Sequence, residues 1–107
     1  MDHTDLARYA RAMRAPDASR PVFLFYSDPG HGWLCVPASV VRRLGVKPSR
    51  YSYAKAGIVY LEEDCDAPAF IKAWRDRHGS DPDIAQITTN HDSFIRSLDH
   101  YSEGVPQ

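Results

Sequence analysis

The sequence predicts an α+β protein with a small antiparallel sheet of about four or five strands, helices on one face of the sheet, and an added N-terminal helix. Apolar runs of strand length alternate with helical stripes, in the order helix, two strands, helix, two strands, helix, strand, helix. The connections are as short as those of hairpins, and no long βαβ crossover is expected. A chain of 107 residues, 43% hydrophobic and 25% charged, fits a single domain over residues 1–107.

The first predicted element is a helix over residues 4–15, an extension of the α+β core predicted over residues 21–101. Thr4 can cap its first turn, and Pro16 ends it. One apolar stripe recurs at helical spacing and consists of Leu6, Tyr9, Ala10 and Met13. This stripe would either cap the domain or pair with its copy in a homodimer.

A hairpin is predicted next. Residues 22–26 are large and apolar and lie between Pro21 and an Asp-Pro-Gly turn, a pattern typical of a buried strand. Residues 33–36 are the second strand, and the loop between the two covers residues 28–32.

Proline and glycine set the limits of the following elements. Pro37 suits the first turn of a short helix, and Gly45 and Gly79 supply left-handed stops for this helix and the next one. Two strands joined by a compact turn are expected between these two helices, at residues 51–53 and 58–61. The inner face of the short helix is formed by Val40, Val41 and Leu44.

The clearest helix start in the sequence is at Asp66, which we expect to be the N-cap, with Cys65 packing on Phe70 as a hydrophobic staple. Residues 84–88 are expected to form a fifth strand. Residues 93–98 fit a helical stripe, with an extended tail as the alternative. The apolar face of the long helix is formed by Phe70, Ile71 and Trp74, with His78 as a further candidate.

Charge and hydropathy exclude some classes of partner. The formal net charge of −1 gives no global field that favours nucleic acid or an anionic membrane. The longest apolar run, residues 21–26, is too short to span a bilayer, and the acidic N-terminus differs from a signal peptide. We therefore expect a cytoplasmic protein without membrane association. In a reducing compartment Cys35 and Cys65 would be free thiols that pack as small hydrophobes.

His31 is the candidate for chemistry, because glycines flank it in the turn and Asp28 could orient its ring as an acid or base. The interpretation we favour is that Asp28 caps the turn and His31 packs on Trp33. No nucleophile is selected by its spacing from His31 among Ser27, Cys35 and Ser39.

No metal and no cofactor is expected. Zinc sites usually include a close pair of ligands, whereas the available side chains are scattered along the chain. Phosphate-binding and hydrolase motifs are also absent from the sequence. The scattered candidates are His31, Cys35, Cys65, His91 and His100.

Carboxylates and aromatic side chains mark a candidate binding surface. The acidic run from Glu62 to Asp66 could mimic nucleic-acid phosphates, or it could interact with the helix dipole. Tyr51 and Tyr53 alternate with Ser52, so they share one strand face, which is either a binding surface or part of the core. The predicted binding residues are His31, Trp33, Tyr51, Tyr53, Glu62, Glu63 and Asp64.

Three segments together resemble a family of small uncharacterised proteins from bacteriophages and bacterial mobile elements. They are residues 28–34 (DPGHGWL), 51–53 (YSY) and 59–66 (VYLEEDCD), and the similarity covers roughly residues 22–98. The resemblance implies a phage or mobile-element context, with no activity or catalytic residue to carry over.

A second stretch is similar to AbrB-type swapped-hairpin transcription factors. It consists of residues 33–37 (WLCVP) and 40–46 (VVRRLGV), followed by a hairpin. Such proteins bind DNA as dimers through a basic surface. Pro48 and Ser49 replace their usual Gly-Asp pair here. The residues this resemblance implies for nucleic-acid contact are Arg42, Arg43, Lys47 and Arg50.

The function expected from these observations is a non-enzymatic binding protein of phage or mobile-element origin. It would occupy a surface on a host macromolecule, in the first place a host protein, and counter-defence inhibition is one form of this function. One alternative is a dimeric DNA-binding regulator of AbrB-like type. The other is a small hydrolase or transferase centred on His31.

Overall fold

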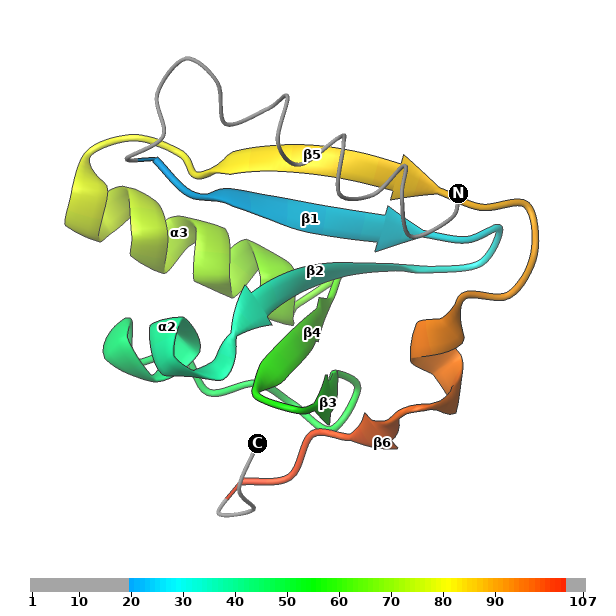
Figure 1. Ribbon diagram of the computed structural model, residues 1–107. Helices are drawn as coiled ribbons and strands as arrows, with labels where there is room; N and C mark the ends of the chain where they lie inside the picture. Colours follow the sequence, from blue (N-terminus) through cyan, green and yellow to red (C-terminus); the bar gives the residue numbers. More distant parts are fainter. Residues whose placement is uncertain (1–19, 104–107) are drawn as a thin grey trace.

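A computed structural model describes residues 20–103, which form an α+β fold built on one six-stranded mixed sheet (Figure 1). The strands lie in the order β5-β1-β2-β4-β3-β6. The predicted helix over residues 4–15 lies outside the described residues. In chain order the elements are β1 (Val22–Ser27), β2 (Gly32–Pro37), α2 (Ala38–Arg43), β3 (Tyr53–Lys55), β4 (Ile58–Glu62), α3 (Asp66–His78), β5 (Asp83–Thr88), the 3-10 helix η1 (Phe94–Ser97) and β6 (Asp99–His100).

The α+β class is confirmed, but the prediction of a purely antiparallel sheet of four or five strands is wrong. Strands β1 and β5 pair in parallel from Val22 opposite Asp83 to Ser27 opposite Thr88. The other pairs are antiparallel. Since β1 is antiparallel to β2 and β2 to β4, strand β4 runs in the same direction as β5. Helix α3 is therefore the crossover of a βαβ unit, which local hydrophobic patterns did not reveal.

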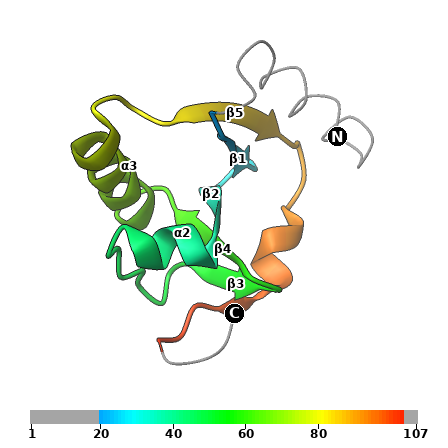
Figure 2. The same ribbon diagram turned by 60° about the vertical axis from the view of Figure 1, so that its left-hand side comes forward.

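Helices α2 and α3 cover one face of the sheet, which we call the helix face (Figure 2). Leu34, Leu61 and Phe70 are fully buried there. Phe23 meets Phe70 edge to face, with ring centroids 5.3 Å apart. The predicted inner residues of both helices contact this core, as expected: Val40, Val41, Leu44, Phe70, Ile71 and Trp74.

Both predicted glycine stops are present. Gly45, just after α2, has φ +72°, and Gly79, the C-cap of α3, has φ +82°. The start of α3 differs from the expectation, because the N-cap is Cys65 and its thiol is exposed. No helix within residues 20–103 has both the length and the apolar character needed to cross a bilayer.

A long connection covers part of the other face of the sheet, which we call the cleft face. Residues 89–98 lead from β5 at one edge to β6 at the opposite edge, and we call them the crossing segment (Figures 1 and 2). Phe94 packs edge to face on Tyr26 at 5.4 Å and on Tyr60 at 5.9 Å. Ile95 is fully buried. The predicted helix over residues 93–98 is thus a 3-10 helix followed by a sixth strand.

Candidate functional site

The cleft face contains a hollow of about 400 Å³, which we call the aromatic cleft. It is lined by all seven residues that the sequence predicted for binding, together with Gly32, Cys65, Arg96 and His100. Strand pairing explains much of this set, because directly opposed residues share a face. Trp33 lies opposite Glu62, and Tyr53 lies opposite His100. Segments far apart in the sequence therefore meet in one hollow.

Aromatic rings form the floor and rim of the aromatic cleft. Trp33 is only 3% exposed and lies 6.2 Å from Tyr53 between ring centroids. His100 stacks on Tyr53 at 4.5 Å. The expected proximity of His31 to Trp33 is present, with centroids 6.1 Å apart.

Tyr51 and Tyr53 do not share one strand, contrary to the prediction. Strand β3 begins at Tyr53, and Tyr51 stands in the preceding turn with 76% of its surface exposed. The cause is Ser52, which is fully buried and donates its hydroxyl hydrogen to Asp66 at 2.5 Å. Both tyrosines still line the aromatic cleft, one half-buried and the other open to solvent.

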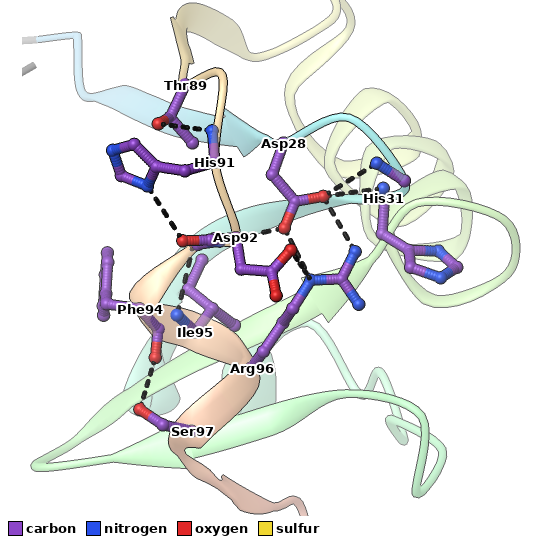
Figure 3. Close-up of polar contacts among 11 residues, drawn as sticks. Asp28, His31, Thr89, His91, Asp92, Phe94, Ile95, Arg96 and Ser97 are labelled. Carbon is purple, nitrogen blue, oxygen red and sulfur yellow. Dashed lines mark hydrogen bonds and ion pairs between the residues drawn. The ribbon is translucent and has the colours of Figure 1, made fainter.

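Asp28 anchors one end of the aromatic cleft, although it does not line it. Its buried carboxylate accepts main-chain N–H bonds from Gly30 at 3.0 Å, His31 at 2.9 Å and Ser93 at 2.9 Å (Figure 3). It also accepts bonds from Arg96, at 2.6 Å from Nε and 2.9 Å from Nη2. The predicted capping of the turn is confirmed by the first two bonds. The other three tie the turn to the crossing segment.

Electrostatics favour the charged form of this pair. The Arg96 guanidinium holds the pKa of the Asp28 carboxyl far below its usual range, and main-chain N–H groups act in the same direction against desolvation. The pKa of Arg96 is raised in turn, mainly by its hydrogen bond to Asp28. From this position the guanidinium carbon lies 5.5 Å from the Trp33 ring centroid, a cation–π distance.

Gly30 leaves room for this arrangement. A Cβ at Gly30 would come within 2.8 Å of Arg96 Nη2. Sequence reasoning missed Arg96, which lies 68 residues from Asp28 and has no local signal that links the two.

The geometry around His31 bears on the catalytic alternative. Asp28 takes the main-chain N–H of His31, and the imidazole points away from the carboxylate (Figure 3). Each oxygen of that carboxylate already accepts bonds from Arg96 and the main chain. The arrangement therefore presents the ring beside Trp33 and uses Asp28 to order the turn.

The acidic run divides into structural and free carboxylates. Glu62 accepts hydrogen bonds from the N–H groups of Asp64 (2.9 Å), Cys65 (2.6 Å) and Asp66 (2.9 Å). It thus supplies acceptors for main-chain N–H groups at the start of α3, which lack a partner within the helix. Asp66, the expected N-cap, is instead buried and accepts bonds from the Ser49 main chain and hydroxyl. Within residues 20–103, the carboxylates of Glu63 and Asp64 form no hydrogen bond or ion pair.

The basic residues implied by the AbrB-type resemblance lie outside the aromatic cleft. Arg42 and Arg43 are exposed in the last turn of α2. Lys47 Nζ lies 3.7 Å from the Glu103 carboxylate, and the Arg50 carbonyl is 2.6 Å from His100 Nδ1. These residues follow one another along a single segment, and all four are solvent-exposed.

The cysteines occupy different environments. Cys35 is half-buried on the cleft face, where desolvation raises the pKa of its thiol. Cys65 is exposed and lines the aromatic cleft, so its predicted packing as a hydrophobe is wrong. In the part of the chain that the structure describes, no three His, Cys, Asp or Glu side chains are grouped to hold a metal ion.

Comparison with protein-family models, with curated proteins and with solved structures found no match to this chain.

Proposed function

We propose that the protein is a non-enzymatic binding protein that occupies a surface on a host macromolecule through the aromatic cleft. The observation that carries this proposal is the convergence of aromatic and charged side chains from β2, β3, β4 and the crossing segment on one hollow of about 400 Å³. Aromatic side chains with a polar end are common anchors of protein interfaces.

The hydrogen bonds of two carboxylates near the aromatic cleft also support a binding function rather than a catalytic one. Asp28 and Glu62 use their carboxylates to hold the main chain in place. These bonds occupy the two carboxylates, which makes them poor candidates for a general base. The aromatic rings and two exposed carboxylates are what the surface offers to a partner.

The host context comes from the resemblance to small proteins of bacteriophages and mobile elements. In that context the partner is a host protein, and counter-defence inhibition is the most specific form of the proposal. The alternative of DNA binding through Arg42 and Arg43 makes a different prediction for the same experiment.

The test is affinity capture from bacterial lysate with the full chain. Wild-type protein is compared with Tyr51→Ala and with the double variant Arg42→Ala/Arg43→Ala, all three shown to be folded by circular dichroism. The proposal predicts a protein that is retained by the wild type and by the arginine variant and is lost with Tyr51→Ala. Retention of no macromolecule, or equal retention by Tyr51→Ala, would overturn it.

A further inference from the structure

We propose that the aromatic cleft takes a cationic side chain, lysine or arginine, from a protein partner. This inference rests on the proposed function and names the chemistry of the partner. It follows from the balance of charge in the cleft and from the way the protein already uses one of its own cations there.

Counted over residues 20–103, negative charge in the aromatic cleft exceeds positive charge once internal pairs are set aside. Arg96 is the cleft's guanidinium, and its charge is matched by the buried carboxylate of Asp28. Glu62 is matched by three main-chain N–H groups at the start of α3. Glu63 and Asp64 remain, both solvent-exposed and both in the wall of the same hollow.

The N–H groups at the start of α3 do not bond these two carboxylates. Acidic residues near a helix start commonly interact with its positive end. Here Glu62 already accepts hydrogen bonds from the N–H groups at that end, at 2.6–2.9 Å. Glu63 and Asp64 are thus available to an external cation.

The aromatic lining suits the same ligand. The face of an indole or phenol ring attracts a guanidinium or ammonium group. Arg96 demonstrates this on the Trp33 ring at 5.5 Å. Tyr51 offers a second ring, 76% exposed, on the rim shared with Glu63 and Asp64. A cation between this ring and the carboxylates would combine both attractions.

An anionic ligand fits less well. His100 Nδ1 lies 2.6 Å from the Arg50 carbonyl, so this nitrogen donates its hydrogen there. The guanidinium of Arg96 is directed at Asp28 through two of its nitrogens. Among residues 20–103, a phosphate in the cleft would therefore meet two carboxylates without an ionic partner and no guanidinium without one.

The experiment measures binding of the full chain to labelled probes by fluorescence anisotropy. The probes are oligolysine and oligoarginine peptides, an oligoglutamate peptide and a single-stranded oligonucleotide. The test variant is Glu63→Gln/Asp64→Asn. Its matched control is Asp76→Asn/Asp81→Asn, which removes the same formal charge from one exposed carboxylate in α3 and one just after it, both outside the aromatic cleft.

The proposal predicts binding of both basic peptides, with a loss of about tenfold in affinity for the test variant and less than about threefold for the control. Tyr51→Phe should retain binding and Tyr51→Leu should weaken it, because only the former keeps the ring. Equal losses in both double variants, or preferred binding of the oligonucleotide or the acidic peptide, would overturn the inference.

The two proposals fail in different ways. If the lysate partner is lost with Tyr51→Ala but basic peptides do not distinguish the double variants, the cation assignment is wrong and the binding role of the cleft stands. If Tyr51→Ala retains the partner as the wild type does, the proposed function fails as well.

Discussion

The helix face and the cleft face are built from the same strands, yet they differ in how far their side chains are buried from solvent. On β2, Leu34 is fully buried in the apolar core of the helix face, whereas its neighbour Trp33 lies in the floor of the aromatic cleft. On β4, Leu61 and Glu62 divide in the same way. Alternation along a strand thus assigns one set of residues to stability and the other to recognition.

The covering elements explain the contrast. Helices α2 and α3 seal the helix face with close apolar contacts. The crossing segment covers the cleft face with one short 3-10 helix, held at the Asp28–Arg96 pair. Most of the fold's stability should therefore depend on the first face, and the geometry of the aromatic cleft on the second.

The largest expected effect is on the helix face. Leu34→Ala removes a fully buried side chain from the core and should lower the free energy of unfolding by about 3–4 kcal/mol. Urea denaturation followed by circular dichroism measures this change. A loss below about 1 kcal/mol would show that the helix face does not carry the stability assigned to it.

Breaking the anchor of the crossing segment should cost less. Asp28→Asn removes the charge that pairs with Arg96. We expect the free energy of unfolding to fall by about 2–3 kcal/mol, less than for a fully buried pair because the Arg96 side chain is one-third exposed. Urea denaturation gives the value. The folded variant, measured without denaturant, should also bind oligolysine more weakly than the wild type. The reason is that Asp28 no longer fixes Arg96 and the turn at Gly30 and His31. Unchanged stability would contradict the anchoring role.

The same anchor has a defined pH dependence. Because the folded state lowers the pKa of Asp28 below its ordinary value of 3.8, its stabilisation is complete above that value and declines as pH falls below it. The stability difference between wild type and Asp28→Asn should therefore be constant from about pH 7 to pH 5 and smaller near pH 3. A difference that grows on acidification would have the wrong sign.

On the cleft face, stability and binding should separate. Tyr51→Ala alters an exposed ring and should change the unfolding free energy by less than about 0.5 kcal/mol. Capture of the lysate partner should nevertheless be lost. A large destabilisation would mean that Tyr51 belongs to the packing rather than to the recognition surface.

The smallest effect is expected at the basic segment after α2. Arg42→Ala/Arg43→Ala should leave both stability and partner capture close to wild type, because these exposed side chains lie outside the aromatic cleft. A titration with duplex DNA at several salt concentrations completes the comparison. DNA affinity that falls steeply with salt and is lost in this variant would favour the regulator alternative.

Local patterns predicted most elements and the majority of the residues that line the aromatic cleft, because apolar runs, glycine stops and unusual polar or aromatic clusters are recognised over a few residues. Gly45 and Gly79 illustrate this for helix ends. Which distant segments of the chain pair with each other is not encoded locally. The parallel pairing of β1 with β5 and the hydrogen bond from Arg96 to Asp28 therefore have no local signal. Ser52 shows the same limit, because its burial against Asp66 shifts the start of β3.

The most direct test uses the two tryptophans of the chain, since Trp33 lines the aromatic cleft and Trp74, a residue of α3, packs against the core on the helix face. Fluorotryptophan-labelled full-length protein is titrated with an oligolysine peptide and followed by ¹⁹F NMR. We expect a saturable shift of the Trp33 resonance while the Trp74 resonance stays in place. A shift confined to Trp74, equal shifts of both, or no shift at saturating peptide would contradict it.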